Sequence, residues 1–380
     1  MLKFTSALYL GMEHASDELR PWQSLTTGVP AVLSTVAGAP ALAADLAALT
    51  GMESATLAPS TLHVFWDLFG IWPSERVAFY VDEAAYPVGR WGVERMAAQG
   101  APAGTFVHHD AASLAAKLRA AGRRPVVLVD GYCPECGRMA PLAEYLAAVR
   151  RYGGWLVIDD TQALGVFGRN FGPAAPYGKG GGGSFEWWKA QKPEALVVCS
   201  MAKGFGVPMA FLAGNKRMIA RFESTSETRT HSSPVSAAQV SAGERALLFN
   251  RVQGDAARRK LAQLVKRFRI RLGKAGWTPA GGLFPVQAFP IPSEKEALAI
   301  YASLLRLGVE PVLQAAGHGG QRRISFLITA SHRADDLDQA ADAWLAAVSR
   351  GTLRDPQTFS GFRGFSRKTR DQRIEGGIRR

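Results

Sequence analysis

Apolar residues gather in short, uninterrupted runs in the middle of the chain. The clearest runs are VVLVD (126–130), WLVID (155–159) and ALVVCS (195–200), each of strand length. Such runs predict strands buried on both faces, because a half-exposed strand alternates apolar and polar residues. Between the first two lies PLAEYLAAVRRYGG (141–154), whose apolar residues recur at helical spacing between a proline and a glycine pair. The pattern predicts an α/β fold with a mostly parallel sheet and helices on both faces.

The pattern changes in the last third of the chain. From about residue 248 the sequence becomes helical and basic, and it then alternates apolar strands with further helices. This predicts a smaller C-terminal α+β domain over residues 248–350, following a large domain over residues 46–247. Residues 1–45 are expected to pack against the small domain. Residues 351–380 are rich in arginine and glycine and are expected to form a basic, flexible tail.

Composition fits a two-domain enzyme. The 380 residues are 47% hydrophobic, enough to bury a large core, and no apolar run approaches the roughly 18 residues that span a bilayer. The first residues become acidic too early for a secretory signal peptide. Only three cysteines occur, so a disulfide scaffold is not expected. We therefore expect a cytoplasmic protein that does not act at a membrane.

The positive charge is unevenly distributed. Of the net charge of +13, the tail contributes +5, from eight basic and three acidic residues. A diffuse positive charge on the rest of the chain attracts anionic substrates such as phosphates or acyl thioesters. Aromatic residues stand among the arginines of the tail, as they do in some RNA-binding segments. A solvated terminus explains them more simply, so we do not expect nucleic acid as a partner.

Two of the apolar runs end in residues that suit pyridoxal phosphate chemistry. Asp159 closes WLVID, and Lys203 follows ALVVCS by three residues in a stretch nearly free of charge. Ligands of parallel sheets bind beyond the carboxyl ends of the strands, where both side chains are expected. Burial lowers the pKa of a lysine, so that its neutral amine becomes available for Schiff-base formation. A buried carboxylate at the same edge needs a cationic partner such as a protonated pyridine nitrogen.

A family resemblance extends this interpretation. The segments GGWLVIDDTQALGVFG (153–168) and ALVVCSMAKGFGVPMAFLAGNKRMI (195–219) resemble the α-oxoamine synthases, a branch of the fold-type-I pyridoxal phosphate enzymes that includes 8-amino-7-oxononanoate synthase. Similar order and spacing continue in VDGYCPECGRMAPLAEYL (129–146), FVHHDAASL (106–114) and ITASHRADDLD (328–338). The resemblance implies a fold-type-I transferase within the class I and II aminotransferase superfamily.

The resemblance also assigns roles by position. Lys203 would be the Schiff-base lysine and Asp159 the partner of the pyridine nitrogen. Ser200 matches a residue that binds the cofactor phosphate. The resemblance implies two further phosphate positions. The first is a turn before a helix, formed by Ser60, Thr61 and Leu62. The second is the pair Ser232 and Ser233, through which a neighbouring subunit contacts the same phosphate.

Four positions depart from the family pattern or replace part of it. Gln162 stands where the family has a histidine that bonds the ring hydroxyl of the cofactor, and Tyr86 stands where a histidine stacks on its ring. The arginine that binds the substrate carboxylate is expected near Ser325. Arg323 lies two residues earlier on the same strand, hence on the same face, and is our candidate for substrate binding. These changes indicate that the substrate differs from those of the family.

The resemblance implies a homodimer that binds pyridoxal 5'-phosphate and condenses an amino acid with an acyl-CoA or an acyl-carrier thioester. Transamination is the first alternative, because an aromatic ring such as that of Tyr86 covers the cofactor in many aminotransferases. A degenerate paralogue that serves as a partner subunit is the second alternative, favoured by the two missing histidines. Retention of Lys203 and Asp159 argues for an enzyme.

Three further motifs receive no functional role from the sequence. The CPEC motif (133–136) has the spacing of half a zinc site or of a redox pair, but no second cysteine pair accompanies it, so we expect no metal. The KGGGGS segment (179–184) lacks the register of a phosphate loop and is interpreted as a loop at the rim of the active site. His108 and His109, near the end of a predicted strand, are interpreted as structural.

Overall fold

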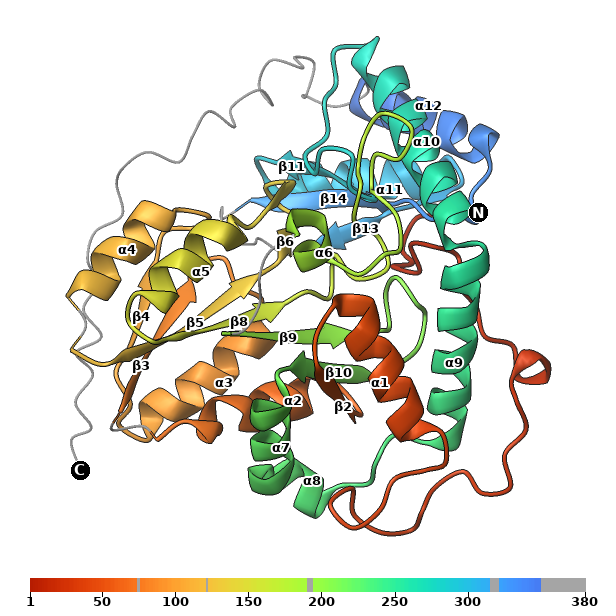
Figure 1. Ribbon diagram of the computed structural model, residues 1–380. Helices are drawn as coiled ribbons and strands as arrows, with labels where there is room; N and C mark the ends of the chain where they lie inside the picture. The colour runs from red at the N-terminus through yellow and green to blue at the C-terminus, as the bar shows by residue number, and fades with distance from the viewer. Residues whose placement is uncertain (74–75, 121, 190–193, 315–320, 350–380) are drawn as a thin grey trace, which may run out of the picture.

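A seven-stranded sheet forms the centre of the computed structural model (Figure 1), which describes residues 1–73, 76–120, 122–189, 194–314 and 321–349. The strand order is β2-β10-β9-β8-β5-β3-β4. Four neighbouring pairs are parallel, and β10 runs antiparallel to both of its neighbours. The strands are β2 (Ser54–Ala58), β3 (Val77–Asp82), β4 (Ala103–Phe106), β5 (Arg124–Asp130), β8 (Trp155–Asp159), β9 (Ala195–Ser200) and β10 (Ala210–Gly214).

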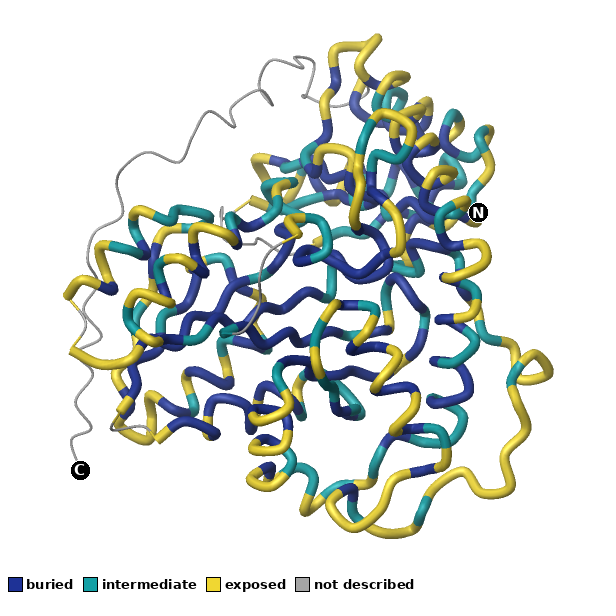
Figure 2. Tube along the Cα trace, in the orientation of Figure 1, coloured by how far each residue is buried: buried dark blue, intermediate teal, exposed yellow. Residues whose placement is uncertain are grey.

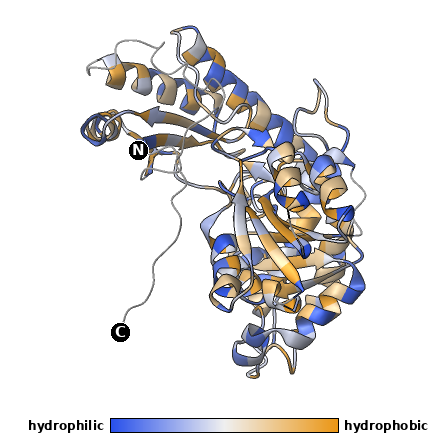
Figure 3. Ribbon diagram, turned by 90° about the vertical axis from the view of Figure 1, so that its left-hand side faces the viewer, coloured by the Kyte–Doolittle hydropathy of each residue, from blue (hydrophilic) through white to orange (hydrophobic). Residues whose placement is uncertain are grey.

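Helices cover both faces of this sheet, as the uninterrupted apolar strands predict. Alternate residues of β5 enter different cores: Val126 and Leu128 pack with α2 and α3, whereas Val127 and Val129 pack with α4 and α5. Figure 2 shows the buried strands between more exposed helices, and Figure 3 shows their apolar character. The helices around the sheet are α1 (Ala39–Thr50), α2 (Thr61–Leu68), α3 (Pro87–Ala98), α4 (Ala111–Arg119), α5 (Leu142–Arg150), α6 (Ser184–Trp188), α7 (Lys216–Thr225), α8 (Glu227–His231) and α9 (Ala237–Val252).

The three strands predicted from the apolar runs are confirmed. WLVID and ALVVCS coincide with β8 and β9, and VVLVD forms all but the first two residues of β5. The predicted helix after β5 is α5, with Pro141 at its N-cap. The predicted α/β class and mostly parallel sheet are therefore correct.

A smaller sheet with its own helices follows in the C-terminal part of the chain. Its three antiparallel strands, in the order β11-β14-β13, lie against the helices seen at the top of Figure 1. The predicted domain boundary at residue 248 falls inside α9. The next helix, α10, packs against α12 of the C-terminal part. The elements are α10 (Gly254–Gly273), β11 (Val286–Ile291), α11 (Glu294–Arg306), β12 (Val309–Glu310), β13 (Val312–Gln314), β14 (Arg322–Leu327) and α12 (Ala334–Ser349).

The beginning of the chain contacts this smaller unit. Strand β1 (Leu2–Lys3) pairs in parallel with β12, and the ring of Phe4 stacks on that of His332 with their centroids 4.5 Å apart. Two short 3-10 helices, η1 (Ser16–Glu18) and η2 (Phe69–Ile71), complete the helical elements. None of the described helices combines the length and apolar character needed to cross a membrane. The predicted tail, 351–380, lies outside the described residues.

Candidate active site

Asp159 and Lys203 meet at the carboxyl edge of the large sheet. Asp159 is the last residue of β8, and Lys203 lies just beyond the neighbouring strand β9. The Asp159 side chain is only 8% exposed, and its Oδ1 accepts a hydrogen bond from the backbone N–H of Thr161 at 3.1 Å. Burial lowers the pKa of the Lys203 amine, although the charge of Asp159 opposes this shift. The pair thus combines a buried carboxylate with an amine that deprotonates more easily than an ordinary lysine.

Asp130 is a third ionisable group at this edge, and the sequence analysis assigns it no role beyond ending a strand. It lies opposite Asp159 in the register of β5 and β8. Burial and the charge of Asp159 raise the pKa of Asp130 well above its usual value. Burial also raises the pKa of Asp159, against the hydrogen bonds from Thr161 and the charge of Lys203. The edge therefore holds more potential negative charge than one lysine balances, and a cationic ligand group would relieve it.

Tyr86 borders the same edge. It precedes α3, and its backbone N–H donates to Asp130 Oδ1 at 3.2 Å. Its ring centroid lies 5.9 Å from Lys203 Nζ, within the range of a cation–π contact. The Tyr86 residue is 55% exposed, so its ring has an open side. This placement suits an aromatic ring that stacks on a flat ligand held by Lys203.

The turn after β8 connects the two strand ends. Thr161 Oγ1 accepts a hydrogen bond from the backbone N–H of Ser200 at 2.9 Å, and Ser200 Oγ accepts one from Ala202 at 3.2 Å. Gln162 Oε1 accepts a hydrogen bond from Tyr9 Oη at 2.9 Å. Sequence reasoning missed Tyr9, because its contact spans 153 positions along the chain. This contact fixes the carbonyl end of Gln162, so its amide N–H₂ is the end that can donate to a ligand.

The start of α2 has the features of a phosphate site. Ser60 occupies the N-cap position, yet its hydroxyl does not cap the helix and is instead hydrogen-bonded to His63 Nδ1 at 2.9 Å. Thr61 and Leu62 are the first two helical residues. Backbone N–H groups at a helix start attract anions, and no side-chain cap occupies them in the described structure. The predicted Ser60–Thr61–Leu62 turn thus lies where the sequence analysis expects it, after strand β2.

Ser232 and Ser233 lie at the end of α8, which packs against α2. Thr228 of α8 donates through Oγ1 to the carbonyl of His63 at 3.3 Å. The hydroxyl of Ser232 donates to the carbonyl of Thr228, and Ser233 is exposed. These contacts keep both serines in a surface segment of this chain. Their predicted role concerns a neighbouring subunit and stays a prediction.

Arg323 is held by an acidic partner in the large domain. It lies on β14, where its guanidinium contacts Glu135 at 2.7 Å, and its side chain is 12% exposed. Ser325, the position of the expected arginine, donates through Oγ to Gln314 Oε1 at 2.7 Å within the small sheet. The ion pair joins the small sheet to the turn that follows β5, because Glu135 stands only five residues after Asp130.

The glycine-rich loop is fixed by the acid next to Asp159. Asp160 Oδ2 accepts a hydrogen bond from the backbone N–H of Ser184 at 2.8 Å. Gly183 has a φ of +89°, and a Cβ atom there would lie 2.0 Å from Asp160 Oδ2. Only glycine permits both the backbone conformation and this approach. The loop therefore has a defined conformation and is attached to the residue that follows Asp159.

Comparison with known proteins places the chain in a family. The sequence model for aminotransferase class I and II matches residues 92–343. The chain belongs to the aminotransferase class I and II family. Within that family it is similar to the 8-amino-7-oxononanoate synthase of Burkholderia ambifaria, with 32% identity over 259 residues. It is also similar to that of Alcanivorax borkumensis, with 28% identity over 253 residues. The resemblance to α-oxoamine synthases stated from the sequence is confirmed by these relatives.

The matches to these two relatives cover only part of each protein. Each covers 66% of this chain, but 55% and 62% of the respective relative. Solved structures extend the likeness of the fold. Serine palmitoyltransferase from S. paucimobilis superimposes with a TM-score of 0.80 at 16% identity, over 92% of this chain and 87% of that chain. The 8-amino-7-oxononanoate synthase of Francisella tularensis gives 0.69 at 14% identity, over 92% and 98%. The predicted fold type is confirmed.

Proposed function

We propose that this protein is a pyridoxal phosphate-dependent enzyme that condenses an amino acid with an acyl thioester. The observation that carries the proposal is the placement of Lys203 and Asp159 at adjacent strand ends, with the ring of Tyr86 beside the amine. Family membership and the names of the relatives, 8-amino-7-oxononanoate synthase and serine palmitoyltransferase, support the same reaction class.

The donors at the sheet edge fit the proposed cofactor. Asp159 would hold the pyridine nitrogen in its protonated form, which would also relieve the carboxylate of its uncompensated burial. The start of α2 and Ser200 would bind the phosphate, and Gln162 would donate to the ring hydroxyl. Tyr86 would cover the ring. When bound, pyridoxal phosphate supplies an electron sink for negative charge at the α-carbon of an amino acid.

Lys203 has two duties in this proposal. Its amine would hold the cofactor in the resting enzyme and, once freed, would accept the α-proton of the bound amino acid. Both duties require the neutral amine, which burial favours by lowering the pKa of Lys203. Asp159 and Asp130 act in the opposite direction, since their negative charges favour the ammonium form. Binding of a cation beside Asp159 would weaken that influence, lower the pKa of Lys203 further and leave more of its amine in the neutral form at neutral pH.

The substrate carboxylate would be bound by Arg323. In the present structure the Arg323 guanidinium forms an ion pair with Glu135. The substrate carboxylate would therefore compete with Glu135 for Arg323. An equivalent contact at position 325 is replaced by the Ser325–Gln314 pair, which carries no charge. These two features support a changed amino-acid preference relative to the synthases that the chain resembles. We also propose a homodimer, in which Ser232 or Ser233 reaches the phosphate of the neighbouring subunit.

Transamination is the second candidate function, and the position of Tyr86 favours it. An aromatic side chain next to Lys203 replaces the histidine expected in the synthases, and its exposed ring offers stacking without an imidazole. A degenerate subunit without activity of its own is the third. It would retain the fold but show no turnover with any amino acid.

One experiment separates the three candidates. The purified protein is mixed with pyridoxal phosphate, and a panel of amino acids is added while the visible spectrum is recorded. Responding amino acids are then supplied with acyl-CoA thioesters or with keto acids, and products are identified by mass spectrometry. A β-keto amine with free CoA supports condensation, and a new keto acid supports transamination. A colourless protein in which borohydride fixes no cofactor at Lys203 would refute the cofactor itself.

A further inference from the structure

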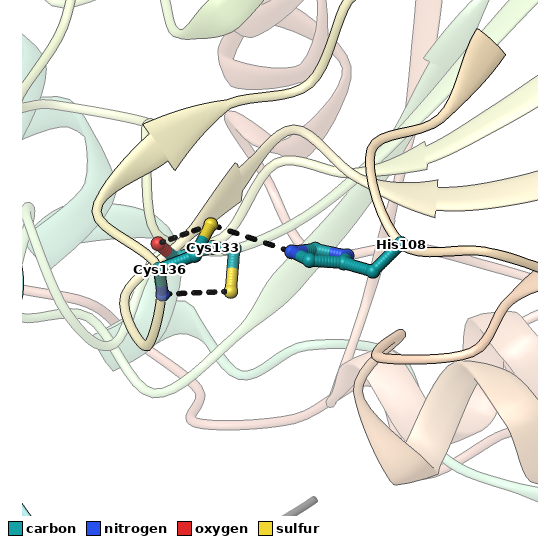
Figure 4. A group of neighbouring side chains, drawn as sticks. All are labelled: His108, Cys133 and Cys136. Carbon is teal, nitrogen blue, oxygen red and sulfur yellow. Dashed lines mark hydrogen bonds between the residues drawn. The ribbon is translucent and has the colours of Figure 1, made fainter. Parts of the chain in front are cut away.

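A cluster of cysteines and histidines lies next to the proposed active site and has no part in the proposed reaction. Cys133 and Cys136 stand in the hairpin between β6 (Tyr132–Cys133) and β7 (Arg138–Met139). His108 and His109 follow β4. Figure 4 shows His108 directed at the two cysteines of the hairpin, and His109 Nδ1 lies near Cys136 Sγ. The donor atoms of His108, Cys133 and Cys136 all lie within 4.8 Å of one another.

The distances within the cluster suit a tetrahedral metal ion. His108 Nε2 lies 3.3 Å from Cys136 Sγ, and His109 Nδ1 lies 3.7 Å from the same sulfur. Zinc bonds of about 2.3 Å to sulfur and about 2.0 Å to nitrogen at tetrahedral angles place such a pair about 3.5 Å apart. The separation between His108 Nε2 and Cys136 Sγ therefore matches two ligands of one ion, and Cys133 Sγ is a third donor of the same group. His109 groups instead with Asp82 and His108, and its ring stacks on that of His108 with the centroids 3.8 Å apart.

The hairpin holds its sulfur atoms as a metal-binding turn requires. The backbone N–H of Cys136 points to Cys133 Sγ at 3.4 Å, and that of Gly137 donates to the carbonyl of Cys133 at 2.9 Å. Gly137 has a φ of +71°, and a Cβ atom there would lie 2.8 Å from Gly281, so the turn depends on glycine.

The histidines are oriented from behind by a buried carboxylate. Asp82 Oδ1, at the end of β3, is hydrogen-bonded to His108 Nδ1 at 2.7 Å and leaves Nε2 directed at Cys136. Asp82 Oδ2 accepts the backbone N–H of His109 at 3.1 Å. A carboxylate behind a histidine is the usual arrangement in zinc sites, because it fixes the ring and strengthens the nitrogen donor. His109 adopts a φ of +54°, a strained conformation that carries its ring to the sulfur.

We propose that His108, Cys133 and Cys136 form a zinc site. These residues supply three of the four positions of a tetrahedral zinc ion, and His109 Nδ1 lies 3.7 Å from Cys136 Sγ as a further nitrogen beside the cluster. The ion would fasten the β6–β7 hairpin to the segment after β4, and the hairpin carries Glu135, the partner of Arg323. The site would thus stiffen the wall of the active site that faces the small sheet. This proposal revises the expectation from the sequence that CPEC binds no metal.

A disulfide between Cys133 and Cys136 is the competing use of the motif. A redox pair has no need for the two imidazoles or for Asp82 behind them. Cys199, the third cysteine, is fully buried in β9 and belongs to neither arrangement. It therefore serves as the matched control for both.

The first test measures metal in the full-length protein. Wild type, the Cys133→Ser/Cys136→Ser double variant and Cys199→Ala are dialysed against metal-free buffer and analysed by mass spectrometry for metals. We expect about one zinc per chain in wild type and in Cys199→Ala, and at least a tenfold loss in the double variant. Background metal in wild type that added zinc does not raise, or full zinc in the double variant, would overturn the proposal.

The second test uses wild type alone and does not depend on the folding of any variant. Zinc-loaded and chelator-treated protein are alkylated, and the modified cysteines are identified by peptide mapping. Zinc should protect Cys133 and Cys136, chelation should expose them at least tenfold faster, and Cys199 should stay unmodified in both. A Cys133–Cys136 disulfide in the non-reduced protein, or equal alkylation with and without zinc, would contradict the site. Neither test requires pyridoxal phosphate or turnover, so each outcome is independent of the proposed function.

Discussion

Two regions at the carboxyl edge of the large sheet collect buried polar groups, and they differ in how those groups are arranged. In the carboxylate–lysine region, Asp130, Asp159 and Lys203 influence one another by charge, and Tyr86 stands 5.9 Å from the amine. In the cysteine–histidine cluster, nitrogen and sulfur atoms converge to within 3.3 Å and 3.7 Å. Spread donors around an aromatic ring suit an extended organic cofactor, whereas converging donors suit a single ion. Spacing, more than the number of charges, distinguishes the two.

The largest expected effect concerns the amine of the first region. Lys203→Ala should lower turnover by at least about 10³-fold, because it removes the amine proposed to attach the cofactor and to move the α-proton. Product formation measures the loss of proton transfer, and the visible spectrum measures the loss of cofactor attachment. Lys203→Arg keeps the positive charge and should be equally inactive, while the exposed Lys117→Ala is the control. Substantial turnover in Lys203→Arg would show that charge alone is needed there.

The two carboxylates of the first region should contribute unequally to turnover. Asp159→Asn should lower turnover by about 10²–10³-fold, the loss expected when one placed electrostatic contact is removed, and Asp130→Asn should lower it less. The pH dependence gives a second measure. Removal of either negative charge makes the ammonium form of Lys203 less favourable and lowers its pKa further, so the amine should become reactive at a lower pH than in wild type.

This shift can be followed without turnover. The protein is incubated with pyridoxal phosphate over a pH series and reduced with borohydride, and label at Lys203 is quantified. Labelling should rise with pH in every variant that keeps the lysine, with its midpoint displaced to lower pH in Asp159→Asn. A midpoint that moves upward would mean that Asp159 does not act on Lys203 through its charge.

The second region predicts a smaller effect from the carboxylate behind the histidine. Asp82→Asn should weaken zinc binding by about 10–100-fold, because the ring of His108 loses its orienting partner while His108, Cys133 and Cys136 all remain. Competition with a coloured chelator measures the affinity. Glu144→Gln, an exposed acid on α5, is the control for a general change in charge. Equal affinities for wild type and Asp82→Asn would place His108 outside the metal site.

The smallest effect concerns the contact that links the two regions to the small sheet. Glu135→Gln should release Arg323 and lower the KM for the amino acid by about twofold to fivefold, since a partly exposed ion pair contributes about 0.2–1 kcal/mol. Zinc content should not change, because the cysteines on both sides of Glu135 are retained. An unchanged KM, or one that rises, would remove Arg323 from the substrate site.

The local pattern of the sequence is enough to predict three neighbouring strands of the large sheet and the residues that follow them. The runs that become β5, β8 and β9 are apolar throughout because both faces of a central strand are buried, so strand identity and burial follow from the residues themselves. Asp159 and Lys203 could be found because each follows its strand directly. Parallel neighbours then bring strand ends together without any further information.

The contacts that cross the chain could not be found in this way. Tyr9 reaches Gln162 over 153 positions, and Glu135 reaches Arg323 from another sheet. The proposed zinc ligands were missed for the same reason: the sequence shows only one cysteine pair, and His108 stands 25 residues before Cys133, after a different strand. Local periodicity determines which segments become strands and which of their residues are buried. Only the packing of β3, β4 and β5 side by side decides that Asp82, His108 and Cys136 surround one point, because that convergence depends on strand order.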